Sequence, residues 1–145
     1  MARVNVTPVE TKKVSPVAAS KKIDLSLNYG KAIQLYQNKQ YEKAIIAFEN
    51  LLKRGIKPAL ADNCTFWMGV CYFNLKRTNQ AISTFKDVLS YPGSDKAESA
   101  YFMIGQCYEQ MGATNLAKLS FEQMLRSYPK GTMKQLAEKK IALLR

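Results

Sequence analysis

A unit of about 36 residues occurs three times in this sequence, and this repetition restricts the fold more than any other feature. Repeats of this length are single supersecondary units that stack, because one unit alone cannot bury its apolar face. The earliest unit precedes the next by 36 or 37 residues and carries Tyr36, Ala44, Ile45, Phe48 and Leu52. The positions of the second unit that recur 36 residues later are Ala61, Gly69, Cys71, Tyr72, Asn79, Ala81, Phe85 and Leu89.

Each unit shows the apolar spacing of two helices. In the second unit Cys64, Met68, Cys71 and Leu75 are separated by four, three and four residues, which places them on one helical face. A polar turn at 76–79 and a second helix at 80–90 follow, and Pro and Gly at 92 and 93 end it. The sequence predicts an all-α, right-handed α-solenoid with helix–turn–helix units at about 25–58, 61–93 and 97–131 and a capping helix at 132–145.

The first 24 residues differ from the remainder of the chain. They are basic and rich in Val, Thr, Lys and Pro, and their apolar residues follow no helical period. We expect a flexible N-terminal arm that precedes the repeat domain at 25–145.

Small residues recur at fixed places in the units. Gly69 and Gly105 on the first helices, with Ala81 and Ala117 on the second, would let paired helices approach closely. A Gly within a helix costs about 1 kcal/mol relative to Ala, so its recurrence implies a packing need. The first unit departs from this pattern, because Ile33 stands 36 residues before Gly69 and its turn counts one residue fewer.

The order of residue types in these units is distinctive. It runs through Met68-Gly69, Tyr72, Ala81, Phe85 and Pro92, and again through Ile104-Gly105, Tyr108, Ala117, Phe121 and Pro129. This order resembles the tetratricopeptide repeat (TPR) family over about residues 25–145. The resemblance implies a protein that binds other proteins, with the first helix of each unit lining a concave groove.

A finer resemblance rests on Phe66-Trp67-Met68-Gly69, Tyr72 and the ending Tyr128-Pro129-Lys130-Gly131. These residues look like the C-terminal repeat domain of the Tol-Pal system coordinator family, which would imply a role in a bacterial envelope. The first 22 residues contain no apolar signal segment. We therefore expect a location in the cytoplasm or at the inner membrane surface, and a periplasmic one only if a signal sequence is missing from this chain.

The TPR groove positions, carried onto this chain, predict where a partner would bind. Phe66 and Phe73 are seven residues apart and share a helical face, and Phe102 follows Phe66 by 36. They predict an aromatic patch beside amides that can bond a peptide backbone, although such a stripe also fits a core. Trp67 either packs against the second helix of the first unit or anchors a partner. The predicted groove comprises Gln34, Asn38, Asn63, Phe66, Val70, Phe73, Asn74, Phe102, Gln106 and Gln110.

The net charge of +11 favours an anionic partner: an acidic protein, a lipid headgroup surface or a nucleic acid. Nucleic acid ranks lowest, because the basic residues lack the recurrent aromatic platform of single-strand binders. Basic residues on second helices and turns also fit an ordinary solvated face. The predicted basic surface comprises Lys53, Arg54, Lys76, Arg77, Lys86, Lys118 and Arg126.

Features of an enzyme are absent from the sequence. It has no His, no Gly-rich phosphate loop and no nucleophile elbow. Cys64, Cys71 and Cys107 fit small buried hydrophobes, and the first two are about 10 Å apart along one helix, too far to form a bridge. We predict no catalytic residue, metal, cofactor or small-molecule substrate. The sequence predicts a protein-binding scaffold or adaptor, a peripheral subunit of a larger bacterial assembly, with electrostatic binding to an anionic surface as the alternative.

Overall fold

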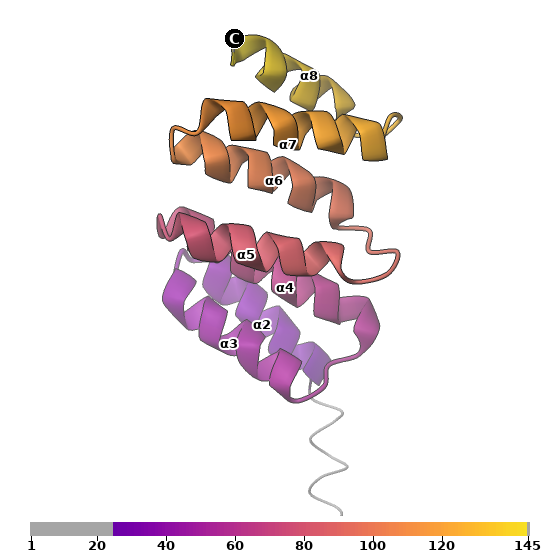
Figure 1. Cartoon of the computed structure of the whole chain (residues 1–145). Helices are drawn as coiled ribbons and strands as arrows, with labels where there is room; N and C mark the ends of the chain where they lie inside the picture. Colours follow the sequence, from indigo (N-terminus) through magenta and orange to yellow (C-terminus); the bar gives the residue numbers. More distant parts are fainter. Residues whose placement is uncertain (1–24, 145) are drawn as a thin grey trace, which may run out of the picture.

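The computed structural model describes residues 25–144, which form seven α-helices and no strand (Figure 1). The predicted arm at 1–24 lies outside the described residues. Each helix packs mainly against its neighbours in chain order, so the predicted all-α solenoid is confirmed. The helices are α2 (Leu25–Gln37), α3 (Tyr41–Lys53), α4 (Pro58–Asn74), α5 (Thr78–Leu89), α6 (Ala97–Gln110), α7 (Thr114–Ser127) and α8 (Lys134–Leu143).

The helices form three antiparallel pairs, α2/α3, α4/α5 and α6/α7, and α8 packs on the last pair. The turns within pairs lie along one edge of the molecule, and the loops between pairs lie along the opposite edge (Figure 1). In α8, Ala137 is fully buried in one cluster with Phe121. The last helix therefore covers the apolar face that α6 and α7 would otherwise expose, as stacked repeats require.

The three turns within pairs have the same geometry. Each contains a residue with positive φ: Lys39 at 61°, Lys76 at 62° and Gly112 at 76°. Each of these residues donates its backbone N–H to the carbonyl three residues earlier, at 2.9 to 3.0 Å. Lys39 and Lys76 are 37 residues apart, so the first turn is as long as the second. The prediction of a shortened first turn is wrong.

The recurring glycines allow close contact between paired helices. A Cβ atom on Gly69 would lie 2.6 Å from the Phe85 ring, and one on Gly105 would lie 2.5 Å from the Phe121 ring. No real Cβ atom approaches a ring this closely, so each ring occupies the space that a side chain would need. Buried apolar side chains recur at matching places of the three second helices: Phe48, Phe85 and Phe121, and then Leu51, Val88 and Met124.

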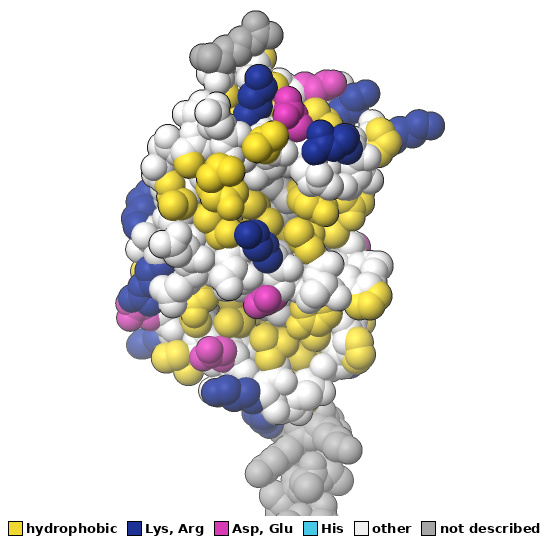
Figure 2. Space-filling view, in the orientation of Figure 1, with side chains coloured by type: hydrophobic (Ala, Val, Ile, Leu, Met, Phe, Trp, Pro, Cys, Tyr) yellow, Lys and Arg dark blue, Asp and Glu magenta, His cyan; other side chains and the backbone are white. Residues whose placement is uncertain are grey.

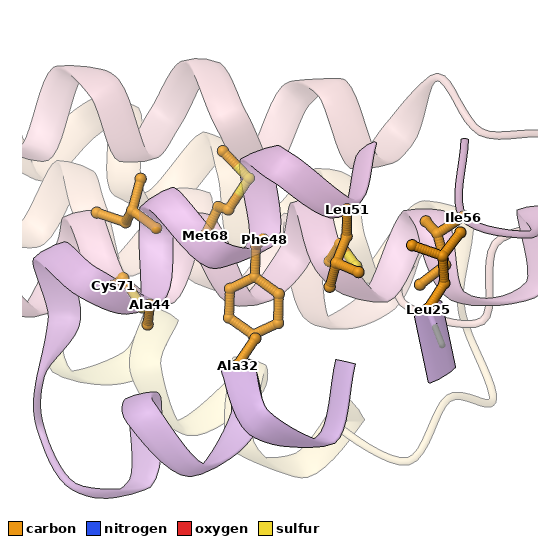
Figure 3. Packing of buried hydrophobic residues seen from close by; sticks show 10 residues of the cluster. Leu25, Ala32, Ala44, Phe48, Leu51, Ile56, Met68 and Cys71 are labelled. Atoms are coloured by element: carbon orange, nitrogen blue, oxygen red, sulfur yellow. The ribbon is translucent and has the colours of Figure 1, made fainter. Parts of the chain in front are cut away.

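The first unit meets the same packing need with alanine. Ala32 is fully buried and lies against the ring of Phe48, as Figure 3 shows. Ala32 precedes Gly69 by 37 residues, the same offset that relates the turns. Ile33 is half-buried and does not occupy the glycine position. The predicted match of Ile33 to Gly69 is therefore wrong by one residue.

The first unit is predicted to end at residue 58, but Pro58 instead begins the second unit. It occupies the first turn of α4. Proline is well tolerated there, because the first N–H groups of a helix have no intrahelical acceptor and its φ already suits a helix. The chain reverses earlier, at Gly55, whose φ is 78°.

Candidate protein-binding groove

The corrected offset of 37 changes the predicted groove in the first unit. Gln34 matches Cys71, a core position, and it is exposed on α2, which has no described unit before it. Asn38 lies in the turn after α2. Neither residue therefore matches the predicted groove positions of α4, because one residue turns a helix by about 100°. The α2 residues that match the predicted groove positions of α4 are Ser26, Tyr29, Ile33, Tyr36 and Gln37.

Phe66 and Phe102 are core residues, with 7% and 4% of their surface exposed. The Phe66 ring lies 5.5 Å from the ring of Phe85, and the Phe102 ring lies 5.2 Å from that of Phe121. Val70 is also buried. The prediction of an open aromatic patch through Phe66 and Phe102 is wrong, because the ring of the second helix covers each of them from within its own unit.

Trp67 joins the first two units and reaches the third. Its ring lies 4.9 Å from Tyr36 on α2 and 5.3 Å from Phe66. The Lys96 ammonium lies 5.3 Å from the Phe66 ring centre and 5.5 Å from that of Trp67, which suits a cation–π contact. Trp67 thus contacts the first helix of the first unit, whereas the sequence predicted the second helix as its neighbour, and it remains half-buried. We call Tyr36, Phe66, Trp67 and Lys96 the aromatic cluster.

Polar groups lie beside this cluster. Asn63 is one helical turn before Trp67, and its Oδ1 atom is buried with no hydrogen-bond partner among the described residues. Asn74 donates from Nδ2 to the Val70 carbonyl at 2.9 Å and remains exposed, and Phe73 is half-buried. A buried acceptor without a donor is unfavourable, and an atom buried in this way is not itself accessible to a bound segment.

The groove becomes polar towards its C-terminal end. Gln106, Glu109 and Gln110 are half-buried on α6. Gln110 Oε1 accepts a hydrogen bond from the Thr78 hydroxyl at 2.6 Å, and Glu109 accepts one from the Lys140 ammonium on α8 at 2.9 Å. These bonds tie α6 to α5 and α8. The predicted groove positions thus include aromatic residues on α2 and α4 and polar residues on α6.

The groove predicted from the sequence did not include Tyr29, Tyr36 or Lys96. If the offset of 37 that relates Phe48 to Phe85 is extended back to α2, Tyr29 and Tyr36 match Phe66 and Phe73, but the sequence alone left an offset of 36 equally open. Burial raises the pKa of Tyr29 and of Tyr36, which keeps both hydroxyls protonated as hydrogen-bond donors. The repeat pattern could not have indicated Lys96, because the residue 36 positions earlier is Leu60, which is apolar.

The predicted basic residues do not gather in one patch. Lys76 and Arg77 lie at the edge formed by the turns within pairs, and Arg77 forms an ion pair with Glu42 at 2.6 Å. Lys86 and Lys118 lie within α5 and α7. Those near the opposite edge, at the ends of α3 and α7, are Lys53, Arg54 and Arg126.

The three cysteines are free and buried. Burial raises the pKa of the Cys64, Cys71 and Cys107 thiols to about 12, so the reactive thiolate is strongly disfavoured. Within residues 25–144 no group of three His, Cys, Asp or Glu residues is placed to hold a metal ion. None of the helices in this part of the chain is long and apolar enough to cross a membrane.

The repeated turns within helix pairs, and the buried phenylalanine rings against small residues, are consistent with the family that a comparison with protein-family models identifies. Residues 64–94 and 99–131 match the family model of the tetratricopeptide repeat. These two segments, 64 of the 145 residues, are similar to tetratricopeptide repeats. The predicted TPR resemblance is confirmed for the second and third units. No curated protein sequence matches the chain.

Solved structures share the TPR fold. The type III secretion chaperone SycD of Yersinia enterocolitica, in complex with a peptide of the translocator YopD, has a TM-score of 0.71 at 18% identity, over 83% of this chain and 91% of SycD. The Arabidopsis OM64 TPR domain has a TM-score of 0.67 at 19% identity, over 83% and 96%. The second TPR domain of human RPAP3, in complex with an HSP70 peptide, has a TM-score of 0.65 at 16% identity, over 88% and 97%.

Proposed function

We propose that this chain is a non-catalytic protein-binding scaffold that holds a segment of a partner protein along its first helices, α2, α4 and α6. The observation that carries the proposal is the pair of half-buried rings of Tyr36 and Trp67 on the first helices, with the half-buried residue Asn63 beside them. Aromatic side chains give large contact area at low entropic cost, and the amide fixes the backbone of a bound segment. The peptide-bound structures of SycD and RPAP3 support this use of the fold.

The groove suggests the order of residues in the partner segment. The part that lies over α2 and α4 would present an apolar or aromatic side chain to Trp67 and Phe73, which are half-buried. The part over α6 would be polar, since Gln106 and Gln110 lie there. The net charge of +11 and the Lys96 ammonium favour a segment with acidic residues.

The test begins with identification of the partner by affinity capture and mass spectrometry, followed by calorimetric titration of the purified partner segment. Asn63→Ala combined with Phe73→Ala should weaken binding about tenfold or more, because it removes a half-buried amide and a half-buried ring from the predicted groove. The matched control is Gln80→Ala with Ser83→Ala, which alters the exposed side of α5. Equal affinity of the folded groove variant and the wild type would refute the proposal. The helical circular dichroism of both variants verifies folding.

For the setting, we propose a peripheral place in a bacterial assembly, in the cytoplasm or at the inner membrane surface. The resemblance to Tol-Pal coordinator repeats supports a bacterial assembly, and the three free cysteines suit a reducing compartment. Cell fractionation with the native protein tests this, and recovery from the periplasmic fraction would contradict it. Retention by anionic vesicles that falls steeply with salt, without partner protein, would instead favour the alternative of electrostatic surface binding.

A further inference from the structure

A second groove lies on the outer side of the third unit, away from the first-helix groove. It encloses about 330 Å³ between α5 and α7 and has α6 as its floor. Leu116 and Leu119 line it from α7 and are 46% and 56% exposed. Leu89 lines it from α5, and Tyr101 and Ile104 from α6. Large apolar side chains that share one exposed surface fit contact with another apolar surface, because that contact removes them from water.

Basic residues border this groove. Lys86 on α5 and Arg126 on α7 belong to its lining, and no acidic residue does. Neither forms an ion pair with an acidic residue in the range 25–144. Figure 2 shows the corresponding view, in which hydrophobic side chains gather around the level of α6 and Lys or Arg side chains lie beside them. An apolar strip with positive borders is complementary to an apolar surface with negative borders.

The preceding unit provides an internal comparison. The residues 36 positions before Leu116 and Leu119 are Gln80 and Ser83, and both are exposed on α5. The residue 37 positions before Lys86 is Glu49, so the matching border there is acidic. The fully buried residues of α5 and α7 nevertheless lie at matching positions of the second and third units. Stacking therefore does not require apolar residues on the outer side of α7.

The geometry points to a docking site at this groove for a short amphipathic α-helix of another protein, apolar on one side and acidic along its borders. We expect a helix because the walls and floor of the groove are themselves helices. Their backbone groups are already bonded within each helix, so they leave none to pair with the backbone of a ligand. An extended segment would find no strand edge to pair with, whereas a helix satisfies its own backbone. Its apolar residues at spacings of three and four would contact Leu116, Leu119 and the floor, and its carboxylates would face Lys86 and Arg126.

The probe for the test is a fluorescein-labelled peptide of about 16 residues, long enough to form a helix when bound. It carries Leu at spacings of three and four on one side and Glu along the borders, and a scrambled peptide has the same composition. Fluorescence anisotropy with the full chain should show saturable binding of the amphipathic peptide only. Leu116→Gln with Leu119→Ser, which installs the residues of the second unit, should weaken it about tenfold or more. Lys86→Glu with Arg126→Glu should weaken it and reduce its salt dependence.

Two control variants separate this site from the groove of the proposed function. Gln80→Ala with Ser83→Ala and Asn63→Ala with Phe73→Ala should both leave peptide affinity unchanged. Equal binding of the scrambled peptide, no binding at about 1 mM chain, or full affinity of the Leu116→Gln, Leu119→Ser variant would overturn the proposal. Sedimentation would also overturn it if the wild type is a dimer and the Leu116→Gln, Leu119→Ser variant is a monomer, because the occupant of the groove would then be a second copy of this chain. Loss of binding to phosphatidylglycerol vesicles in this variant, without peptide binding to the wild type, would assign the groove to a membrane surface.

Discussion

The second and third units have nearly the same interior and different outer surfaces. A Cβ on Gly69 or Gly105 would lie at almost the same distance from the ring of Phe85 or Phe121, and the two turns share four backbone hydrogen bonds. On the outer side, Gln80 and Ser83 of α5 give way to Leu116 and Leu119 of α7. Packing of a helix pair constrains each buried side chain through many neighbours, whereas an exposed side chain meets mainly water. The interior thus specifies the fold, and the two outer surfaces are free to differ in function.

If the interiors are equivalent, removal of the buried ring should have the same large effect in each unit. We expect Phe85→Ala and Phe121→Ala each to lower the free energy of unfolding by about 3–5 kcal/mol, because both side chains are fully buried. Urea titration followed by circular dichroism measures both. A difference of more than about 2 kcal/mol would show that the units are not energetically equivalent.

The glycine contact gives the next largest effect. Gly69→Val and Gly105→Val should each cost about 1–3 kcal/mol by overpacking against the ring. Gly30→Val is the matched control on α2, because a Cβ there meets nothing within 4 Å, and it should change stability by less than about 0.5 kcal/mol. An unchanged urea midpoint for either of the first two variants would refute the close contact.

The hydrogen bonds that link each unit to the loop after it should differ in their contribution to stability more than the interiors of the units do. Ser94 donates to the buried carboxylate of Asp62 at 2.6 Å, whereas Thr132 donates to Glu98 at 3.3 Å near the surface. Ser94→Ala should therefore cost about 1–2 kcal/mol, because it leaves a buried acceptor short of a donor. Thr132→Ala should cost less than about 0.5 kcal/mol, since water replaces its bond. Thermal unfolding compares the two, and the reverse order would contradict this view of the links.

The surface ion pair between Arg77 and Glu42 should have the smallest effect. Both side chains are largely exposed, so water screens their attraction despite the 2.6 Å distance. Arg77→Ala should lower the free energy of unfolding by about 0.2–1 kcal/mol, and added salt should reduce the difference. A double-mutant cycle with Glu42→Ala isolates the pair, and a coupling above about 1.5 kcal/mol would show that it is more than a surface contact.

Much of the fold was predictable because, in a helical repeat protein, most contacts join helices that follow one another in the sequence. The spacing of Cys64, Met68 and Cys71 identified a buried helical face, and the recurrence of Gly69 at Gly105 indicated close helix packing. The pairing followed because short turns force consecutive helices to be antiparallel neighbours. The candidate site was less predictable. Phe66 and Phe102 have the residue type of a binding surface, and only their contact with the next helix shows that they belong to the core.

By itself, the sequence determined the number of units, the helical architecture and the places where small residues are needed. Only the tertiary structure decided the alignment of the first unit, because Ala32 and Ile33 are both plausible partners for Phe48 until the contact is seen. A shift of one residue turns a helix by about 100° and moves every side chain to another face. That rotation replaces Gln34 and Asn38 at the groove positions by Ile33 and Gln37, and it adds Tyr36, whose ring lies against Trp67.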